Sequence, residues 1–275
     1  MTISVRSNNP ALSALQNLNS TQENLTTVQN RLGSGLAVAA AKDDSSGWAI
    51  AQGQRSDLRA LAAVKMSLDR AQSIADLSVT TATSVSNLLL EMKDKALAAT
   101  DTSLDSNSRS TLNNDFKVLL GQVTRVIQDS GFNGTNLLDG STASLRFMAS
   151  ADANSFLTLS GQNLSLGGAI IPLAATASIS TVTQASSVLA NLTTSITNVS
   201  QALGTLGAQS AQVTAHSSFV SRLDDVVTAG IGNIVDANMS KESARLQALQ
   251  VQQQLGTQAL SIANQAPSII LSLFK

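Results

Sequence analysis

The sequence has no cysteine, no tyrosine, one histidine, six phenylalanines and one tryptophan among its 275 residues. Without cysteine the chain cannot form a disulfide, a thiolate zinc site or an iron–sulfur cluster. A single histidine cannot build a multi-histidine metal site. We therefore expect no metal and no cofactor. Because aromatic residues are so few, alanine and the aliphatic residues must fill the core.

Charge is scarce as well. Only 13% of the residues are charged and the net charge is -1, whereas an ordinary soluble domain has roughly 25%. A nearly neutral chain lacks the basic surface that binds nucleic acid. The longest apolar stretch, Leu164 to Ala175, contains glycines and a proline and is too short to span a bilayer. We expect no nucleic-acid partner, no membrane span, and a protein that is cytoplasmic or exported without a cleaved signal.

Apolar residues recur at helical spacing through much of the chain. In residues 15–32, after a helix start at Asn9-Pro10, they follow spacings of 3, 7, 3 and 4 residues, a coiled-coil stripe. In residues 61–96 they alternate at three and four residues, with Ser78 the one polar member. This pattern predicts one helix of more than about 40 residues. A further helix is expected over residues 112–126.

The pattern changes after residue 131. Asn133-Gly134 and Asp139-Gly140 are dipeptides typical of hairpin turns, so we predict a small β-hairpin patch near 132–183. Helical spacing then returns, weakened at Gly230 and Gly232, and a last amphipathic run is expected to end at Pro267. The predicted fold is mainly α, a long antiparallel helical coiled-coil rod with a small β-hairpin patch.

The N-terminal stripe is too narrow to stabilise its helix alone. It offers about six aliphatic side chains at roughly 1.5–3 kcal/mol each, whereas ordering about 22 residues costs on the order of 20–40 kcal/mol. Pairing with the C-terminal helix still leaves both helices half exposed. We therefore expect these terminal helices to gain stability from neighbouring chains, which indicates assembly.

No constellation of side chains indicates catalysis. Asp43 and Asp44 are adjacent, so they do not share a helix face, and we interpret them as capping or inter-subunit residues. His216 lies in an uncharged helical context without a partner nearby in sequence. The glycines match no phosphate-binding pattern. We expect no catalytic residue and no enzyme activity.

Several segments resemble bacterial flagellins. Arg31-Leu-Gly-Ser-Gly-Leu36, followed by Ala41-Lys-Asp-Asp-Ser-Ser-Gly-Trp-Ala-Ile-Ala51, resembles the connector signature of that family. Val235-Asp-Ala-Asn-Met-Ser-Lys-Glu242 is similar to its DAD-x-x-x-E element, with Asn238 in place of the second acid. The remaining similar segments are Phe132-Asn-Gly-Thr-Asn-Leu-Leu-Asp-Gly140, Gln252-Gln-Gln-Leu-Gly256, Ala263-Asn-Gln-Ala-Pro267 and Ile270-Leu-Ser-Leu-Phe274.

The resemblance implies a flagellin-like fold and a structural subunit that polymerises into the flagellar filament for swimming motility. Residues 1–36 and 236–275 would be the two arms of an inner coiled-coil domain, and residues 37–235 an outer-core helical rod. The protein would be secreted and extracellular. Its partners would be other copies of itself, the flagellar export apparatus, an export chaperone, the filament cap and the hook-junction proteins.

The resemblance also implies which residues matter. Subunit packing would rest on Leu15, Leu18, Leu25, Leu32, Leu255 and Ile262. The connector motif would consist of Arg31, Gly35, Lys42, Asp43, Asp44 and Gly47. The C-terminal motif would consist of Asp236, Glu242, Asn264 and Pro267.

Two alternatives share the helical pattern. A soluble coiled-coil adaptor would share the heptads without the terminal motifs, and it would form a fixed small oligomer whatever its termini. A hook–filament junction protein would share related ends but a different centre. Loss of assembly after removal of the termini would favour the filament subunit.

Overall fold

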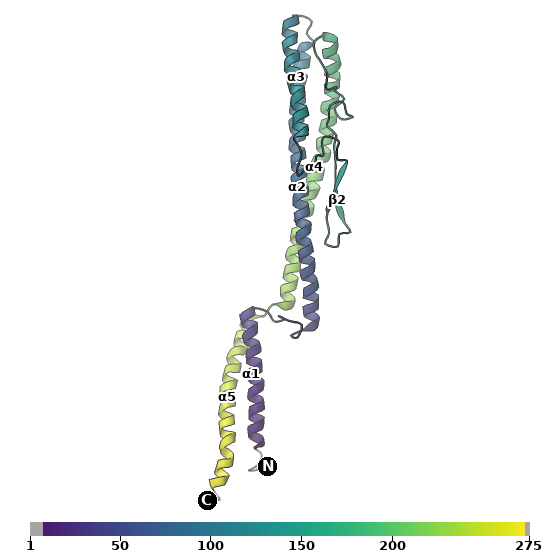
Figure 1. The fold of residues 1–275 in the computed structure, drawn as a ribbon. Coiled ribbons are helices and arrows are strands. Elements are labelled where there is room, and N and C mark those ends of the chain that lie inside the picture. The colour runs from purple at the N-terminus through teal and green to yellow at the C-terminus, as the bar shows by residue number, and fades with distance from the viewer. Residues whose placement is uncertain (1–7, 273–275) are drawn as a thin grey trace. The chain divides into compact units, whose positions relative to one another are not determined.

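A computed structural model of the chain describes residues 8–272. Its helices and strands are shown in Figure 1, in this order: α1 (Asn9–Ser34), α2 (Ser45–Ala99), α3 (Ser106–Gln128), β1 (Ser144–Met148), β2 (Phe156–Ser160), α4 (Val182–Val235) and α5 (Met239–Ser272). The chain forms two compact units, one of Asp57–Asp225 and one of Met1–Ser56 with Val226–Lys275.

In the unit Asp57–Asp225, the long helix predicted from the heptads is confirmed. α2 has 55 residues and begins at Ser45, earlier than the pattern indicated. The heptad positions of α2 are buried, and together with α3, α4 and the residues 164–179 they enclose the largest apolar core. Ser78 is tolerated within this stripe because its hydroxyl donates a 2.7 Å hydrogen bond to the carbonyl of Ile74.

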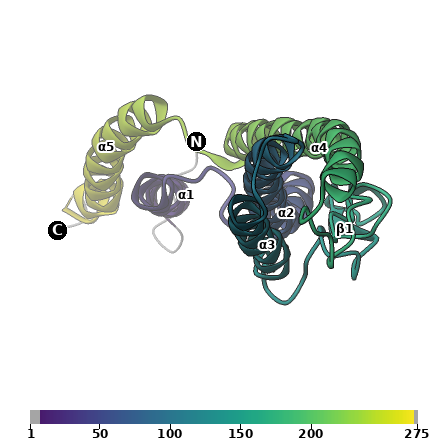
Figure 2. The ribbon, with the colours of Figure 1, turned by 90° about the horizontal axis from the view of Figure 1, so that it is seen from above.

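α2 and α4 run antiparallel, as predicted, and lie side by side in both views (Figures 1 and 2). Thr214 donates a 2.8 Å hydrogen bond to Gln72, and Ser210 donates one of 2.9 Å to Asp76. Residue numbers thus rise along α2 while they fall along α4. The mainly α, flagellin-like rod expected from the sequence is confirmed.

The small sheet is a two-stranded hairpin whose inward side chains pack on the helices. β1 and β2 pair antiparallel. Leu157 and Leu159 are buried against α2 and α4, where Ala71, Ile74, Ala75 and Val213 line the same core. The predicted patch exists, but neither glycine dipeptide turns it, because residues 149–155 connect the strands. Asn133-Gly134, with φ of 50° and 78°, instead closes a tight turn joined by one bridge between Phe132 and Thr135.

The helix end expected at Pro267 is wrong, and the glycines that weaken the helical spacing do not interrupt α4. α4 continues through Gly230 and Gly232 to Val235. α5 continues past Pro267 to Ser272. In a regular helix the N–H of residue 267 would bond to the carbonyl of Ala263, four residues earlier, but proline has no N–H. That carbonyl instead accepts a 2.8 Å hydrogen bond from the side chain of Asn8, so the chain supplies the missing donor.

Hydrogen bonds from polar side chains stabilise the turn between α2 and α3. Asp105 caps α3 by accepting hydrogen bonds from the N–H and the hydroxyl of Ser108. Both bonds lower the pKa of the Asp105 carboxyl from 3.8, and the bond from the N–H has the larger effect. The buried guanidinium of Arg109 donates to the carbonyls of Ala99, Asp101 and Leu104. A cation is favourable there because the carbonyls at a helix C-terminus carry partial negative charge.

The buried side chain of Asn113 should contribute measurably to stability. Its oxygen accepts 2.9 Å hydrogen bonds from the N–H of Ile179 and the hydroxyl of Ser178. Asn113→Ala leaves the buried N–H of Ile179 unpaired, so we expect the free energy of unfolding to fall by about 1–3 kcal/mol. Chemical denaturation followed by circular dichroism measures this change.

The neighbouring Asn114, which is exposed, provides the matched control. Asn114→Ala should change the free energy of unfolding by no more than about 0.5 kcal/mol. Equal effects of the two substitutions would contradict the role assigned to Asn113.

Candidate assembly surface: the arm pair and its connector

α1 and α5 lie side by side and antiparallel in the unit that contains both chain ends (Figure 1). Gln253 donates a 2.6 Å hydrogen bond to Gln22 near the middle of the pair. Arg31, near the end of α1, lies 3.6 Å from Glu242 in the first turns of α5. We call these two helices the arm pair.

The arm pair has a small core. Leu25, Val28 and Leu249 are buried, and Leu246 packs against them. Thr21 is also buried, and its hydroxyl donates a 2.8 Å hydrogen bond to the carbonyl of Asn17 in the preceding turn. Among the side chains that the structure describes, which end at Gln265 in α5, three buried aliphatic residues are few for helices of 26 and 34 residues.

The residues predicted to pack between subunits fall into two groups. Leu15, Leu255 and Ile262 are exposed, by 43%, 65% and 62% of their surface. Leu18 and Leu32 are half-buried, and Leu25 is buried within the chain's own arm pair. The exposed group is therefore not covered by the chain's own arm pair.

The structure adds two residues that were not among the predicted packing residues. Leu12 and Val251 are exposed by 61% and 55%. Each lies three or four residues from a predicted neighbour, Leu15 or Leu255, and so shares its helix face. That spacing was the signal that could have found them. Leu12, Leu15, Val251, Leu255 and Ile262 together are called the apolar arm surface.

A backbone bridge connects the two arms where both helices meet the connector. Gly35 ends α1 in the left-handed conformation, with φ of 73°, and its N–H donates to the carbonyl of Arg31. The carbonyl of Gly35 accepts a 2.8 Å hydrogen bond from Ala237, and an isolated antiparallel bridge joins Leu36 and Asp236.

The carboxylates of the connector motif bind nearby backbone N–H groups. Asp43 accepts hydrogen bonds from the N–H groups of Ala39 and Ala40, at 3.1 and 3.0 Å. Asp44 accepts bonds of 3.0 Å from the N–H groups of Ser46 and Gly47, and so caps α2. Both carboxylates thus accept hydrogen bonds from backbone N–H groups of the connector.

The two remaining connector residues lie close to these caps. Lys42 is exposed. A Cβ at Gly47 would lie 2.8 Å from Oδ2 of Asp44 and 3.5 Å from a methyl of Ile234. The absence of a side chain at Gly47 therefore leaves room for the cap.

The C-terminal motif contains a cap and a buried carboxylate. Asn238 caps α5, since its oxygen accepts a 3.0 Å hydrogen bond from the N–H of Lys241. Asparagine and aspartate cap equally well, so the departure from the DAD pattern preserves this contact. Glu242 is buried, whereas Asp236 and Asn264 are exposed. The side chain of Pro267 and the segment Leu273-Phe274 lie outside the described residues.

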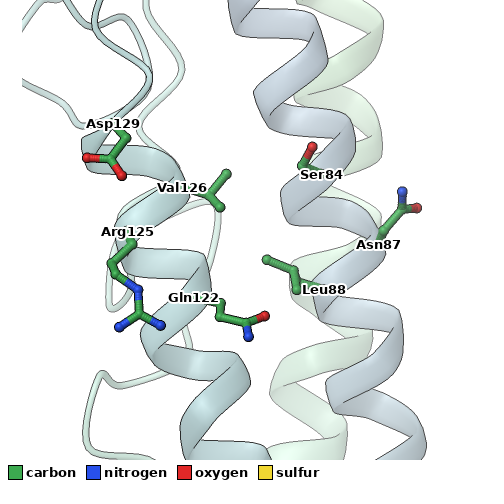
Figure 3. Close-up of a pocket in the computed structure, with 7 residues that line it drawn as sticks. All are labelled: Ser84, Asn87, Leu88, Gln122, Arg125, Val126 and Asp129. Atoms are coloured by element: carbon green, nitrogen blue, oxygen red, sulfur yellow. The ribbon is translucent and has the colours of Figure 1, made fainter.

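A groove of about 520 Å³ runs between α2 and α3 (Figure 3). Leu88 on α2 and Val126 on α3 point into it from opposite walls. The other lining residues are polar: Ser84, Asn87, Gln122, Arg125 and Asp129. The groove is open along its length and holds no buried charge.

His216, the one histidine, has a structural contact. Its Nε2 lies 2.7 Å from the carbonyl of Ala149, which attaches the hairpin connection to α4, and its ring lies 5.9 Å from that of Phe219. Over residues 8–272, no group of three acidic, histidine or cysteine side chains could hold a metal ion. In the same range, no helix is both long and apolar enough to cross a membrane.

The sequence matches two family descriptions. Residues 5–143 match the bacterial flagellin N-terminal helical region, and residues 189–274 match the bacterial flagellin C-terminal helical region. The flagellin FljJ of Caulobacter vibrioides is 47% identical over 100% of this chain and 99% of its own length. The chain belongs to the bacterial flagellins. This flagellin is therefore a structural subunit of the flagellar filament, secreted and extracellular, as the sequence predicted.

More distant relatives also span this flagellin. A flagellin of Brucella melitensis is 34% identical over 99% of both chains. Among solved structures, the crystal structure of Bacillus cereus flagellin has a TM-score of 0.51 at 18% identity, covering 56% of this chain and 88% of the other. A putative flagellar hook-associated protein from Vibrio parahaemolyticus has a TM-score of 0.58 at 16% identity, covering 70% and 100%. At these identities the two structures share the fold alone.

Two glycines near the end of α1 should respond oppositely to alanine. Gly35→Ala forces an alanine into the left-handed conformation, so we expect the free energy of unfolding of this unit to fall by about 1–2 kcal/mol. Gly33 lies within α1, and a Cβ there would meet no atom within 4 Å. Gly33→Ala should therefore raise the free energy of unfolding by about 0.5–1 kcal/mol.

The emission of Trp48 during denaturation measures both effects, because Trp48 is the one tryptophan and the chain has no tyrosine. Losses of equal size at both positions would show that the backbone conformation of Gly35 is not what the connector requires.

Proposed function

We propose that the apolar arm surface is the surface through which subunits of this flagellin pack in the filament. On this proposal residues 1–36 and 236–275 form the inner coiled-coil arms and residues 37–235 form the outer-core rod. Leu15, Leu255 and Ile262 act directly between subunits, whereas Leu25 acts within each chain by holding α1 against α5.

The exposure of the apolar arm surface supports this proposal most directly. Leu255 and Ile262 remain exposed by more than 60% while α1 and α5 are paired within one chain. Burying such side chains stabilises an assembly by roughly 1.5–3 kcal/mol each. The small core within the arm pair cannot supply this stabilisation, so neighbouring copies are the natural source.

The stripe on α5 has the geometry that a helix–helix contact requires. Val251, Leu255 and Ile262 are four and seven residues apart, which places them on one face of the helix. The seam positions between the arms carry glutamine and threonine as well as leucine and valine. A neighbouring helix can therefore cover the stripe without displacing the partner arm.

The further partners follow from the same role. A subunit that assembles outside the cell must pass the flagellar export apparatus, and exposed apolar arms favour an export chaperone that covers them beforehand. The filament cap and the hook-junction proteins would meet the same arms at the two filament ends. We also propose that the chain is not an enzyme, since Asp43 and Asp44 bind backbone N–H groups.

Removal of the arms tests the role of the terminal regions. The full chain and a truncation keeping residues 37–235 are each seeded with filament fragments, then examined by sedimentation and negative-stain electron microscopy. We expect filaments from the full chain and none from the truncation. A small oligomer from both would contradict the proposed role of the arms in assembly.

Substitution within the full chain tests the surface itself. The triple variant Leu15→Ser, Leu255→Ser, Ile262→Ser loses at least about 4 kcal/mol of apolar burial per subunit, so the critical concentration for seeded assembly should rise at least tenfold. Met66 on α2, exposed by 62%, supplies the control Met66→Ser. An unchanged critical concentration in the triple variant would contradict the proposed surface.

A further inference from the structure

One side of the arm pair carries a groove of about 440 Å³ between α1 and α5, which we call the arm groove. The lining residues that matter here are Ser13, Ala14 and Asn17 on α1 and Leu255, Gly256 and Ala259 on α5. Most of these side chains are short, which leaves room in the groove for side chains of another molecule.

The α5 part of the apolar arm surface borders the arm groove. Leu255 lines the groove and is exposed by 65%. Val251 and Ile262 lie four and seven residues from Leu255, so they share its side of the helix. This side of the arm pair therefore offers a groove with an apolar edge.

Leu12 and Leu15 lie on the opposite side of α1. Leu12 is two residues from Ala14, and Leu15 is two residues from both Ser13 and Asn17. Each residue turns an α-helix by about 100°, so residues two apart point about 160° away from each other. Because Ser13, Ala14 and Asn17 line the arm groove, the two leucines face away from it. We call Leu12 and Leu15 the α1 ridge.

Neither side of the arm pair carries a charge at these positions. No aspartate, glutamate, lysine or arginine lies in residues 9–22 or in residues 246–272. The cores of protein interfaces are depleted of charged residues, because a buried unpaired charge is costly. Both the arm groove and the α1 ridge therefore meet this requirement for burial against another molecule.

The two sides differ in shape, and this difference favours contact between unlike sides. A ridge of side chains can fill a groove, whereas two grooves facing each other would leave a void. A contact between unlike patches is heterologous, so each copy uses one patch for one neighbour and the other patch for the next. Such contacts produce open helical polymers when they do not close into a ring, and this flagellin is a filament subunit.

We propose that the α1 ridge of one copy packs into the arm groove of the next copy, where Leu12 and Leu15 contact Leu255 and its apolar neighbours. This inference rests on the proposed function and assigns a binding partner to each part of the apolar arm surface. One contact buries the exposed leucines of α1 and the exposed stripe of α5 together.

Photo-crosslinking identifies what covers the α1 ridge, whatever the offset between two copies along their axes. Asn19 is exposed and lies four residues from Leu15 and seven from Leu12, so it shares their side. A diazirine-bearing amino acid at position 19 reacts only with atoms in contact. The modified full-length chain is copolymerised onto seeds as a minor fraction with isotope-labelled unmodified chains and irradiated. Mass spectrometry then identifies the captured peptides.

In the filament, the captured peptides should include residues 246–265 of another copy, and the monomer should capture no second chain. Capture of α1 alone would mean that ridges pair with each other. The inference would then be wrong, although the arms would still pack between subunits. Capture limited to residues 57–225, or no capture of another copy, would also overturn the inference. The triple variant described above shows separately whether the arms drive assembly.

Filling the arm groove tests the receiving side of the contact. Ala259 is exposed and lines the groove, so Ala259→Leu occupies it without reaching the buried core of the arm pair. The critical concentration for seeded assembly should rise at least about tenfold, because the leucines of the next copy lose their site. An unchanged critical concentration would overturn the inference.

Thr257 provides the matched control. It is exposed and lies two residues from Ala259, so it faces the opposite side of α5. Thr257→Leu should change the critical concentration by less than about twofold. An equal rise in both variants would show that an added leucine anywhere on α5 hinders assembly, which would contradict a specific role of the arm groove.

Discussion

A narrow apolar stripe on each helix must be buried against another helix, and both units of this flagellin are organised by that constraint. In the unit Asp57–Asp225, three helices, the hairpin and the residues 164–179 together cover the stripes. In the arm pair, the described side chains of the two helices include three buried aliphatic residues. The arms are therefore the part of the chain whose burial is least complete.

The long helices were predictable because their signal is repeated. The stripe of residues 61–96 has many members, so one polar residue, Ser78, does not obscure it. The register of the hairpin was not predictable from its turn residues. Asn133-Gly134 does adopt the left-handed conformation that such a dipeptide favours, but it closes a different loop. Sequence identified the local conformation correctly and could not identify which segments it connects.

The error about the helix end at Pro267 arose from a contact across the fold. The carbonyl left unpaired by Pro267 is bound by Asn8, more than 250 residues away in sequence. Gly232 lies beside the carboxylate of Asp236, where a Cβ would be only 2.7 Å from Oδ2. Glycine there accommodates a neighbour rather than ending the helix. Local propensity cannot report the contact of Asn8, because it depends on the folded chain, whereas Asp236 lies only four residues from Gly232.

Among the candidate site residues, sequence located the motifs but not their roles. Asp43, Asp44 and Asn238 cap backbone N–H groups, which is a local role that their residue types permit. Of the six predicted packing residues, half are exposed, and Leu25 is buried within the chain itself. A heptad pattern marks every apolar position of a stripe alike. Which positions face the partner arm and which remain exposed depends on how the two helices are rotated about their axes.

The few apolar residues of the arm seam give this rotation and alignment a physical basis. A shift of α5 by one heptad would place Gly256 and Gln253, or Glu242, opposite Leu25 and Val28, so the small core forms in one register. A buried carboxylate tolerates only the arrangement that places a cation beside it. In a polymer, a misaligned subunit would present a different surface to every neighbour. A uniform contact between subunits therefore requires that the two arms of every chain align in the same way.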